Sequence, residues 1–495
     1  MRHATSGTMR VWAVALLGVF VATACVDEKV VYRDVNAVVA PPTAAQGFVG
    51  YSRQADTQTV CANCHAGAGA NWKGTKHATA WKDLQASGHA TKACEGCHSV
   101  NALGNAVVGD AGWVATGDPR YQDVQCEACH GPGLNHVSSP SKGNVPLASL
   151  LADSTRTDGC GECHRGTHNP FVSEWAQSNH GTMELSEHPR SNPSCQGCHT
   201  GQGALAAMGV TANYKEKSMA KDTLGIVCGV CHDPHAKRID GQLRLSVSDP
   251  DPDKNLCVNC HHKRGQPDPV ASRGPHSPEG PMVLGEAGWW PPNVAADSAL
   301  TRIYGSHGPG ANKRLCATCH MERYDVTDKA TGAFKISSVG HRFIAIPCVD
   351  ATGYPTTEQN CATDTVSAAG YLTGRRFNAC ATSGCHGTPE AAKSAAIASA
   401  TRTRQLRVEL QRLLAQIPKS EFSGTDGKWT TAEGADWNRQ LADGRMWMAS
   451  SVHNPFLLET LLRTSIEQLK KDYPTIKSVS TVDLSAQLQK PARLR

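Results

Sequence analysis

Hydrophobic residues follow a helical period in one part of the chain, the segment 388–495. Two runs of leucine and isoleucine recur there every three or four residues, which places each run on one face of a helix. The first run is Leu406, Leu410, Leu413, Leu414 and Ile417, and the second is Leu458, Leu461, Leu462, Ile466 and Leu469. We therefore predict a C-terminal helical hairpin.

Residues 59–387 show a different pattern. This part is rich in Gly, Pro, Asn and Asp and has little internal periodicity, which predicts short helices joined by irregular connections. Aromatic residues make up only 5% of the 495 residues, so side chains alone offer a modest interior for a chain of this length. The expected fold class is mainly α with a large irregular fraction.

One motif recurs through this irregular part: two cysteines separated by two residues and followed at once by histidine. Eight copies are strict, and a ninth has four residues between its cysteines. The cysteines are Cys61, Cys64, Cys94, Cys97, Cys126, Cys129, Cys160, Cys163, Cys195, Cys198, Cys228, Cys231, Cys257, Cys260, Cys316, Cys319, Cys380 and Cys385. The histidines are His65, His98, His130, His164, His199, His232, His261, His320 and His386.

This motif is the attachment signature of a c-type haem. Two thiols add to the two vinyl groups on one porphyrin edge, and the next side chain then lies beneath the ring and binds iron. Structural zinc sites and thioredoxin-like redox pairs also use paired cysteines, but neither needs a histidine directly after every pair. For Cys380 and Cys385 a disulfide is the alternative. We predict about nine covalently attached haems c, whose macrocycles would fill much of the interior.

The spacing of the motifs divides the chain. Successive first cysteines lie 33, 32, 34, 35, 33 and 29 residues apart, and then 59 and 64. The regular part predicts a repeated unit of one haem with a short helix and loop. The expected organisation is a seven-haem region at 59–265, a two-haem region with long insertions at 266–387 and the helical segment at 388–495.

Twelve histidines remain after the nine motif histidines and His3 are set aside. An electron carrier fills both axial positions of each iron, so this surplus favours bis-histidine ligation. His188 and His276 resemble loop residues, and His77 is ambiguous. The predicted second ligands are His89, His136, His168, His180, His235, His262, His307, His341 and His453.

The N-terminus predicts export. Arg2 and Arg10 precede an apolar run that ends at Cys25 and is too short to span a bilayer comfortably. We interpret 1–24 as a lipoprotein signal peptide, Cys25 as the lipidated residue and 25–58 as a tether; a plain secretory signal is the alternative. In an oxidising compartment Cys348 and Cys361 are expected to form a disulfide. The net charge of +5 is small and spread out, which argues against a nucleic-acid partner.

These features resemble the bacterial multihaem c-type cytochromes, the group that includes nitrite reductase, hydroxylamine oxidoreductase and the decahaem outer-membrane conduits. The resemblance rests on the motif array, on two Trp-x4-His pairs and on three strings: Cys126-Glu127-Ala128-Cys129-His130-Gly131-Pro132-Gly133, Gly340-His341-Arg342-Phe343 and Val452-His453-Asn454-Pro455. It implies a row of stacked and T-shaped haem pairs. The implied function is electron transfer from a membrane-side donor to a terminal acceptor or redox protein, in the periplasm or at the outer membrane or cell surface, with no catalytic residue.

Two other functions stay open at this point. One is an oxidoreductase that acts on a small nitrogen or sulfur oxyanion, such as nitrite, hydroxylamine or tetrathionate, at one open haem. No motif replaces its histidine with the lysine common in ammonia-forming nitrite reductases, and the histidine surplus also argues against this reading. The other is self-association into a conducting filament.

Overall fold

The computed structural model describes most of the chain. The described residues are 40–152, 158–166, 168–181, 191–236, 239–268, 273–292, 294, 307–356, 361, 372–381, 384–422, 427–442, 451–478 and 482–486. The predicted signal peptide, Cys25 and most of the predicted tether lie outside these residues. No helix among them combines the length and the apolar character that crossing a bilayer requires.

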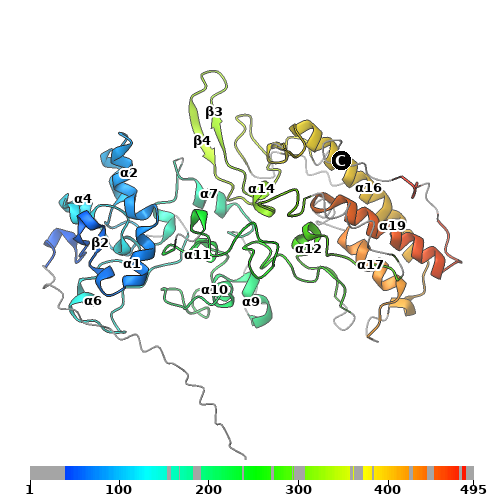
Figure 1. The fold of residues 1–495 in the computed structure, drawn as a ribbon, viewed down its shortest axis with the longest axis horizontal. Helices are drawn as coiled ribbons and strands as arrows, with labels where there is room; N and C mark the ends of the chain where they lie inside the picture. The colour runs from blue at the N-terminus through cyan, green and yellow to red at the C-terminus, as the bar shows by residue number, and fades with distance from the viewer. Residues whose placement is uncertain are drawn as a thin grey trace, which may run out of the picture. The chain divides into compact units, whose positions relative to one another are not determined.

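Short helices dominate the part that carries the cysteine motifs (Figure 1). They are α1 (Ala66–Lys73), α2 (Ala80–Ala86), α3 (Glu95–His98), α4 (Gly112–Thr116), α5 (Cys126–His130), α6 (Leu134–Ser138), α7 (Phe171–Ala176), α9 (Pro193–His199), α10 (Gly201–Ala207), α11 (Cys228–Cys231), α12 (Glu279–Leu284) and α14 (Cys316–His320). Irregular connections and single 3-10 turns join them. The prediction of a mainly α fold with a large irregular fraction is confirmed.

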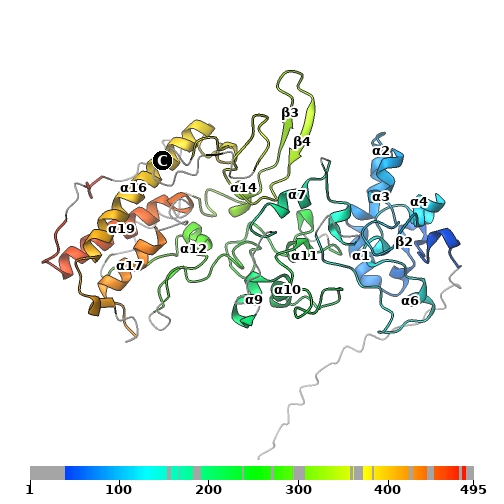
Figure 2. The same ribbon diagram turned by 180° about the vertical axis from the view of Figure 1, so that it is seen from behind.

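The strands form two small antiparallel pairs. Strand β1 (Tyr51–Arg53) pairs with β2 (Gln58–Thr59), and β3 (Tyr324–Thr327) pairs with β4 (Phe334–Ser338). In the second pair Tyr324 lies opposite Ser338, and the register shifts near Thr327. Both views show β3 and β4 as a two-stranded hairpin that extends away from α14 (Figure 2).

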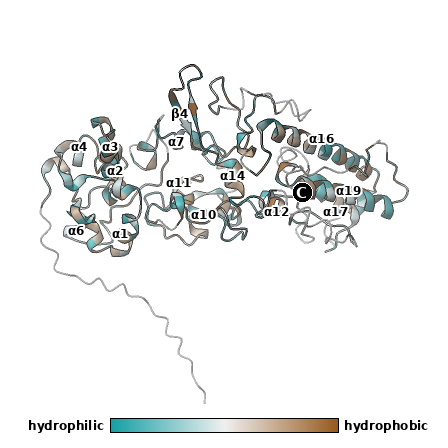
Figure 3. Cartoon of the chain, turned by 45° about the horizontal axis from the view of Figure 1, so that its top comes forward, coloured by the Kyte–Doolittle hydropathy of each residue, from teal (hydrophilic) through white to brown (hydrophobic). Residues whose placement is uncertain are grey.

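Three longer helices form the C-terminal part: α16 (Pro389–Leu414), α17 (Thr431–Leu441) and α19 (Pro455–Asp472). Each begins with a side-chain cap: Thr388 accepts from the Ala391 N–H, Thr430 from Glu433 and Asn454 from Leu457. Both α16 and α19 also have proline at the first helical position. Figure 3 shows hydrophilic and hydrophobic residues alternating along α16, as an amphipathic helix requires.

The predicted hairpin corresponds to α16 and α19, which pack against each other. All ten residues of the two predicted apolar faces are buried in the core cluster that these helices share. The third helix, α17, packs against both and was not predicted. This helix has a single buried leucine, so it lacks the leucine period that marks the other two helices. Its buried residues are Ala432, Glu433, Gly434, Ala435, Trp437, Asn438 and Leu441.

Asn438 connects this helical part to the preceding segment. Its side chain is fully buried, accepts from the Trp289 N–H at 2.8 Å and donates to the Trp289 carbonyl at 2.7 Å. It also donates to the hydroxyl of Ser465 on α19. The buried amide of Asn438 therefore satisfies both backbone hydrogen-bonding groups of Trp289, which lies 149 residues earlier in the sequence.

The regular part of the chain contains a structural repeat. Trp72 donates its indole N–H to the Val124 carbonyl at 3.0 Å, and Trp175 donates in the same way to Ile226 at 2.8 Å. The two bonds recur after about 100 residues, which corresponds to three motifs rather than one. The repeated structural unit therefore spans three motifs.

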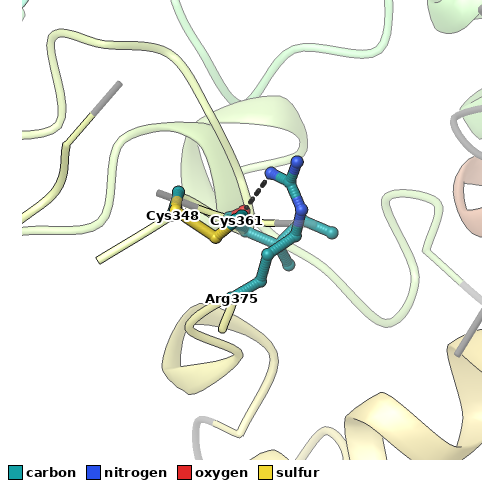
Figure 4. The surroundings of a disulfide bond; sticks show 4 residues. Cys348, Cys361 and Arg375 are labelled. Carbon is teal, nitrogen blue, oxygen red and sulfur yellow. Dashed lines mark hydrogen bonds between the residues drawn. A yellow bond between two sulfur atoms is a disulfide. The ribbon is translucent and has the colours of Figure 1, made fainter. Parts of the chain in front are cut away.

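Cys348 and Cys361 form the predicted disulfide, with their Cα atoms 5.8 Å apart. Arg375 lies beside the bridge (Figure 4) and donates to the Ile346 carbonyl at 3.2 Å. The backbone of Cys348 also forms an isolated bridge with Arg375. The disulfide therefore fixes the strand-like segment that precedes the ninth motif.

Replacing both Cys348 and Cys361 with alanine should lower the free energy of unfolding by about 3 kcal/mol, because the cross-link closes a short loop in the unfolded chain. Thermal unfolding under oxidising conditions measures the change. The unaltered protein treated with a thiol reductant should lose the same stability. An unchanged melting temperature in the double variant would contradict a structural role for the bridge.

Candidate functional site

The nine cysteine motifs are numbered here as sites 1 to 9 in chain order. Most of them occupy a single helical turn: at sites 1, 4, 6 and 7 the histidine N–H donates to the carbonyl of the first cysteine at 2.9 to 3.1 Å. This turn places both thiols and the histidine on one side of the backbone. None of the eighteen motif cysteines, all of which lie within the described residues, forms a disulfide, as the attachment motif requires.

Eight of the nine motif histidines have a second histidine ring close by. Each of these partners lies outside the motifs, and the ring centres are 6.0 to 6.4 Å apart. The pairs are His65 with His136, His164 with His77, His130 with His235, His261 with His180, His199 with His276, His232 with His341, His386 with His307 and His320 with His453.

This separation matches two imidazoles on opposite sides of one metal ion. A metal–imidazole bond is about 2 Å and the nitrogen lies about 1.2 Å from its ring centre, so the two ring centres should be about 6.3 Å apart. The angle between the rings is not fixed, because each ring can rotate about its metal–nitrogen bond. One-to-one pairing of motif with non-motif histidines at this distance fits a haem iron between each pair.

Burial keeps many of these imidazoles neutral. Loss of water lowers the pKa of His77, His180, His341 and His453 to about 4. Burial also lowers the pKa of the motif histidines His164, His232, His320 and His386. A neutral ring keeps the nitrogen lone pair that a metal ion needs.

Backbone carbonyls orient several of the rings through Nδ1. The distance from Nδ1 to oxygen is 3.1 Å for His98 with Ala80, 2.8 Å for His130 with Pro146, 2.7 Å for His232 with Gly241, 2.7 Å for His320 with Phe343 and 2.6 Å for His307 with Val452. A carbonyl at Nδ1 fixes the tautomer that leaves Nε2 free to bind a metal.

Site 7 differs, because a carboxylate replaces the carbonyl. Oε2 of Glu279 lies 3.5 Å from Nδ1 of His261. This neighbour raises the pKa of His261 despite its burial. A carboxylate on the outer nitrogen of a ligating histidine makes that histidine more basic.

Two buried glutamates hold the loops that surround the sites. Glu127, inside site 3, accepts backbone N–H bonds from Val49, Gly50 and Gly133. Burial raises its pKa to about 7, although these bonds act in the opposite direction. Glu174 on α7 is fully buried and accepts from the backbone of Val339 and His341.

In the described part of the structure the nine predicted second ligands fall into two groups: six face a motif histidine and three do not. His136, His180, His235, His307, His341 and His453 each lie at the paired distance from a motif histidine. Within the described residues, no ring contact joins His89, His168 or His262 to a motif histidine. His89 and His168 are exposed, and His262 bonds to the Val258 carbonyl of its own turn.

His77 and His276 occupy the paired distance although the sequence did not single them out. His77 shares the Trp-x4-His spacing of His180, and this repeat was the signal that could have identified it. His276 lies among Pro, Ser and Glu and gives no such signal. Its pairing with His199 depends on the path of the long insertion that follows site 7.

The zinc alternative would need three or four ligands around one point. Within the described residues, no group of three or more Cys, His, Asp or Glu side chains is arranged to hold a metal ion. The histidines instead occur as opposed pairs, each next to two thiols. This arrangement suits a planar macrocycle attached at one edge.

Two family models match parts of the chain. The model described as cytochrome c554 and c-prime matches residues 60–131, and the model described as cytochrome c7 and related cytochrome c matches residues 181–262. Together they cover sites 1 to 3 and sites 5 to 7. Because these families carry covalent haem, the matches show that paired thiols in these two segments bind haem c.

Two similar proteins are also known. A multiheme cytochrome MtrA of Shewanella baltica (strain OS185) is 27% identical over 162 residues, which is 29% of this chain and 44% of that protein. The aligned part thus spans less than half of that relative. The crystal structure of the outer cell wall cytochrome OcwA matches with a TM-score of 0.46 and 18% identity, and covers 76% of this chain and 75% of that one.

Proposed function

We propose that this chain, a bacterial multihaem c-type cytochrome, transfers electrons along nine covalently attached haems outside the cytoplasm. The observation that carries the proposal is the set of eight opposed histidine pairs beside paired thiols. When bound, the haem iron supplies a one-electron couple between its ferric and ferrous states. Two imidazoles per iron suit this role, because charge changes with little rearrangement.

The chain's own residues supply attachment, ligation and orientation. In this proposal the eighteen motif cysteines form the thioethers and the nine motif histidines are the first axial ligands. The second ligands are His136, His77, His235, His276, His341, His180, His453 and His307 for sites 1, 4, 3, 5, 6, 7, 8 and 9. The pairing of His386 with His307 supports haem at the widened ninth motif.

Mass spectrometry of the mature protein tests the count. The mass should exceed that of the processed polypeptide by nine haems. A variant with both Cys380 and Cys385 replaced by alanine should carry eight. If the unaltered protein already carries eight and the variant loses none, the ninth motif binds no haem.

Glu279 should set a low reduction potential at site 7, because its carboxylate makes His261 a stronger donor to ferric iron. Glu279→Gln should therefore raise one potential on the order of 60 mV, which corresponds to a tenfold change for one electron. A spectroelectrochemical titration measures this shift. Exposed Glu286, two residues after the end of α12, gives the control variant Glu286→Gln, which should leave all potentials unchanged.

A second candidate function rests on site 2. Among the described residues, His98 has no second histidine ring at the paired distance, although Ala80 orients it like the other motif histidines. A small molecule such as nitrite or hydroxylamine could be reduced at an iron with one open position. Low-temperature electron paramagnetic resonance tests this: a high-spin ferric signal that changes on addition of nitrite supports it, and low-spin signals alone exclude it.

The proposed location is the periplasm or the cell surface, with a lipid on Cys25 as the membrane anchor. The disulfide between Cys348 and Cys361 supports an oxidising compartment. The physiological partners would be a membrane-side electron donor and an external acceptor. Cys25→Ser should release the protein from the membrane fraction if the anchor is correct.

A further inference from the structure

The path of the chain does not follow the order of neighbouring sites. His136, which faces site 1, belongs to helix α6 directly after site 3. His235, which faces site 3, follows site 6 by three residues. Each of these histidines therefore connects two sites that are not neighbours in the sequence: one site lies between sites 1 and 3, and two lie between sites 3 and 6. The order of the sites in space therefore differs from their order in the sequence.

Thiols of different motifs that lie close together give these contacts directly. Within the described residues there are six such thiol pairs, and each joins two sites. They connect Cys61 to Cys126, Cys97 to Cys163, Cys160 to Cys228, Cys198 to Cys260, Cys257 to Cys316 and Cys319 to Cys380. In site numbers these contacts are 1 with 3, 2 with 4, 4 with 6, 5 with 7, 7 with 8 and 8 with 9.

Two further thiol pairs, at longer range, link the remaining sites of this series. Cys129 of site 3 lies near Cys160 of site 4, and Cys231 of site 6 lies near Cys257 of site 7. Sites 4 and 7 thus each have three neighbours. Sites 2 and 5 each have a single thiol contact, with site 4 and site 7 respectively.

Other bonds confirm the position of these two sites. After site 2, the Gly104 N–H donates to the Glu162 carboxylate of site 4 at 2.5 Å, and the Gly159 N–H donates to the Gly104 carbonyl at 3.1 Å. At site 5, the Gly197 carbonyl accepts from Sγ of Cys260 in site 7 at 4.0 Å. The same relation therefore occurs twice, in agreement with the three-motif repeat.

We infer that sites 1, 3, 4, 6, 7, 8 and 9 form one continuous row in that order, and that sites 2 and 5 are side branches attached at sites 4 and 7. This inference rests on the proposed electron-transfer function and specifies its path. Thioethers lie at one porphyrin edge, so contact between thiols of two motifs brings two macrocycle edges together. Electron transfer falls steeply with the distance between edges, and the row is then the fast path.

The branched order assigns different roles to sites of identical motif chemistry. Removing a site in the row interrupts transfer between its ends, whereas removing a branch leaves this transfer intact. Sites 5 and 6 form a matched pair, because they are neighbours in the sequence and both have the strict motif. Site 5 is the branch and site 6 belongs to the row.

The test injects an electron at one end of the row and detects it at the other. Ser52→Cys, an exposed position on β1 near site 1, carries a ruthenium photosensitiser. His307→Met gives site 9 a methionine ligand, which raises its potential and adds a Met-to-iron absorption band that disappears on reduction. Flash photolysis then measures the arrival rate at site 9.

Two versions of this reporter protein lack one haem each. One has Cys195 and Cys198 replaced by alanine at site 5, and the other has Cys228 and Cys231 replaced at site 6. We expect the arrival rate to change less than about twofold in the first and to fall more than about tenfold in the second. Equal slowing in both, or slowing only in the first, overturns the branched order.

Two measurements keep this result interpretable. Absence of any arrival in the parent reporter counts against the proposed electron-transfer function itself and not only against the order of sites. Electron cryomicroscopy of the unaltered holoprotein gives the iron order without any variant. An iron row that includes site 2 or site 5 between its two ends would overturn the inference even if the variants fail to fold.

Discussion

Replacing His453 with alanine should convert one haem from low spin to high spin. In the proposed assignment this change removes the second imidazole from site 8, where the ring centres of His453 and His320 are 6.2 Å apart. Because the half-buried His453 lies among His320, His307 and His261, which are already paired in the proposed assignment, no other histidine readily takes its place. Electron paramagnetic resonance of the oxidised variant should show a new high-spin ferric signal equivalent to one iron.

The chain offers a close control for this variant. His168 begins the string His168-Asn169-Pro170-Phe171, which matches the string that begins at His453. His168 is exposed, and the described residues provide no motif histidine at the paired distance from it. His168→Ala should therefore leave the spectrum unchanged. A high-spin signal in the His168 variant but not in the His453 variant would reverse the assignment.

Replacing Glu174 with alanine should destabilise the protein and loosen the ligand at site 6. The Glu174 carboxylate accepts from the backbone of His341 at 2.8 Å and lies 3.0 Å from Nη1 of Arg342. Both side chains are almost completely buried, so removing one leaves the other charge uncompensated. Breaking such a pair costs about 3 to 5 kcal/mol. Thermal unfolding measures this loss.

A second readout separates a positioning role from a purely structural one. If Glu174 holds the His341 backbone, its loss should also shift the potential or the spin state of the haem at site 6. Gln177→Ala, at the residue that follows α7, removes only the amide oxygen that accepts from the Arg342 guanidinium and serves as the control. Lower stability with an unchanged haem spectrum would restrict Glu174 to a structural role.

The attachment points of the haems could be predicted from the sequence more completely than the residues that surround them. The Cys-x-x-Cys-His motif is local chemistry, so each attachment point can be recognised within five residues. The apolar faces of α16 and α19 were also recognised, because leucine period is a local property of a helix. Helix α17 was missed because small and polar residues make up most of its buried face, and Trp437 and Leu441 alone do not set a hydrophobic period.

The second histidines depend on tertiary structure. His168 and His453 have the same neighbours in sequence and different environments in the fold, so local context cannot distinguish them. His276 was set aside because it lies in a proline-rich insertion, yet the path of that insertion brings it to His199. The partner of a motif histidine can lie more than a hundred residues away, as with His232 and His341.

His453 lies 133 residues after His320, the motif histidine that it faces, and this separation has a consequence for biogenesis. A chain exported from its N-terminus presents the thiols of site 8 well before it presents α19, and His307 at site 9 bonds to the carbonyl of Val452, next to His453. In the proposed assignment, haem can be attached at site 8 before α19 has been made. The second axial ligand of site 8, and the carbonyl that orients His307 at site 9, then become available only with the residues that lead into α19.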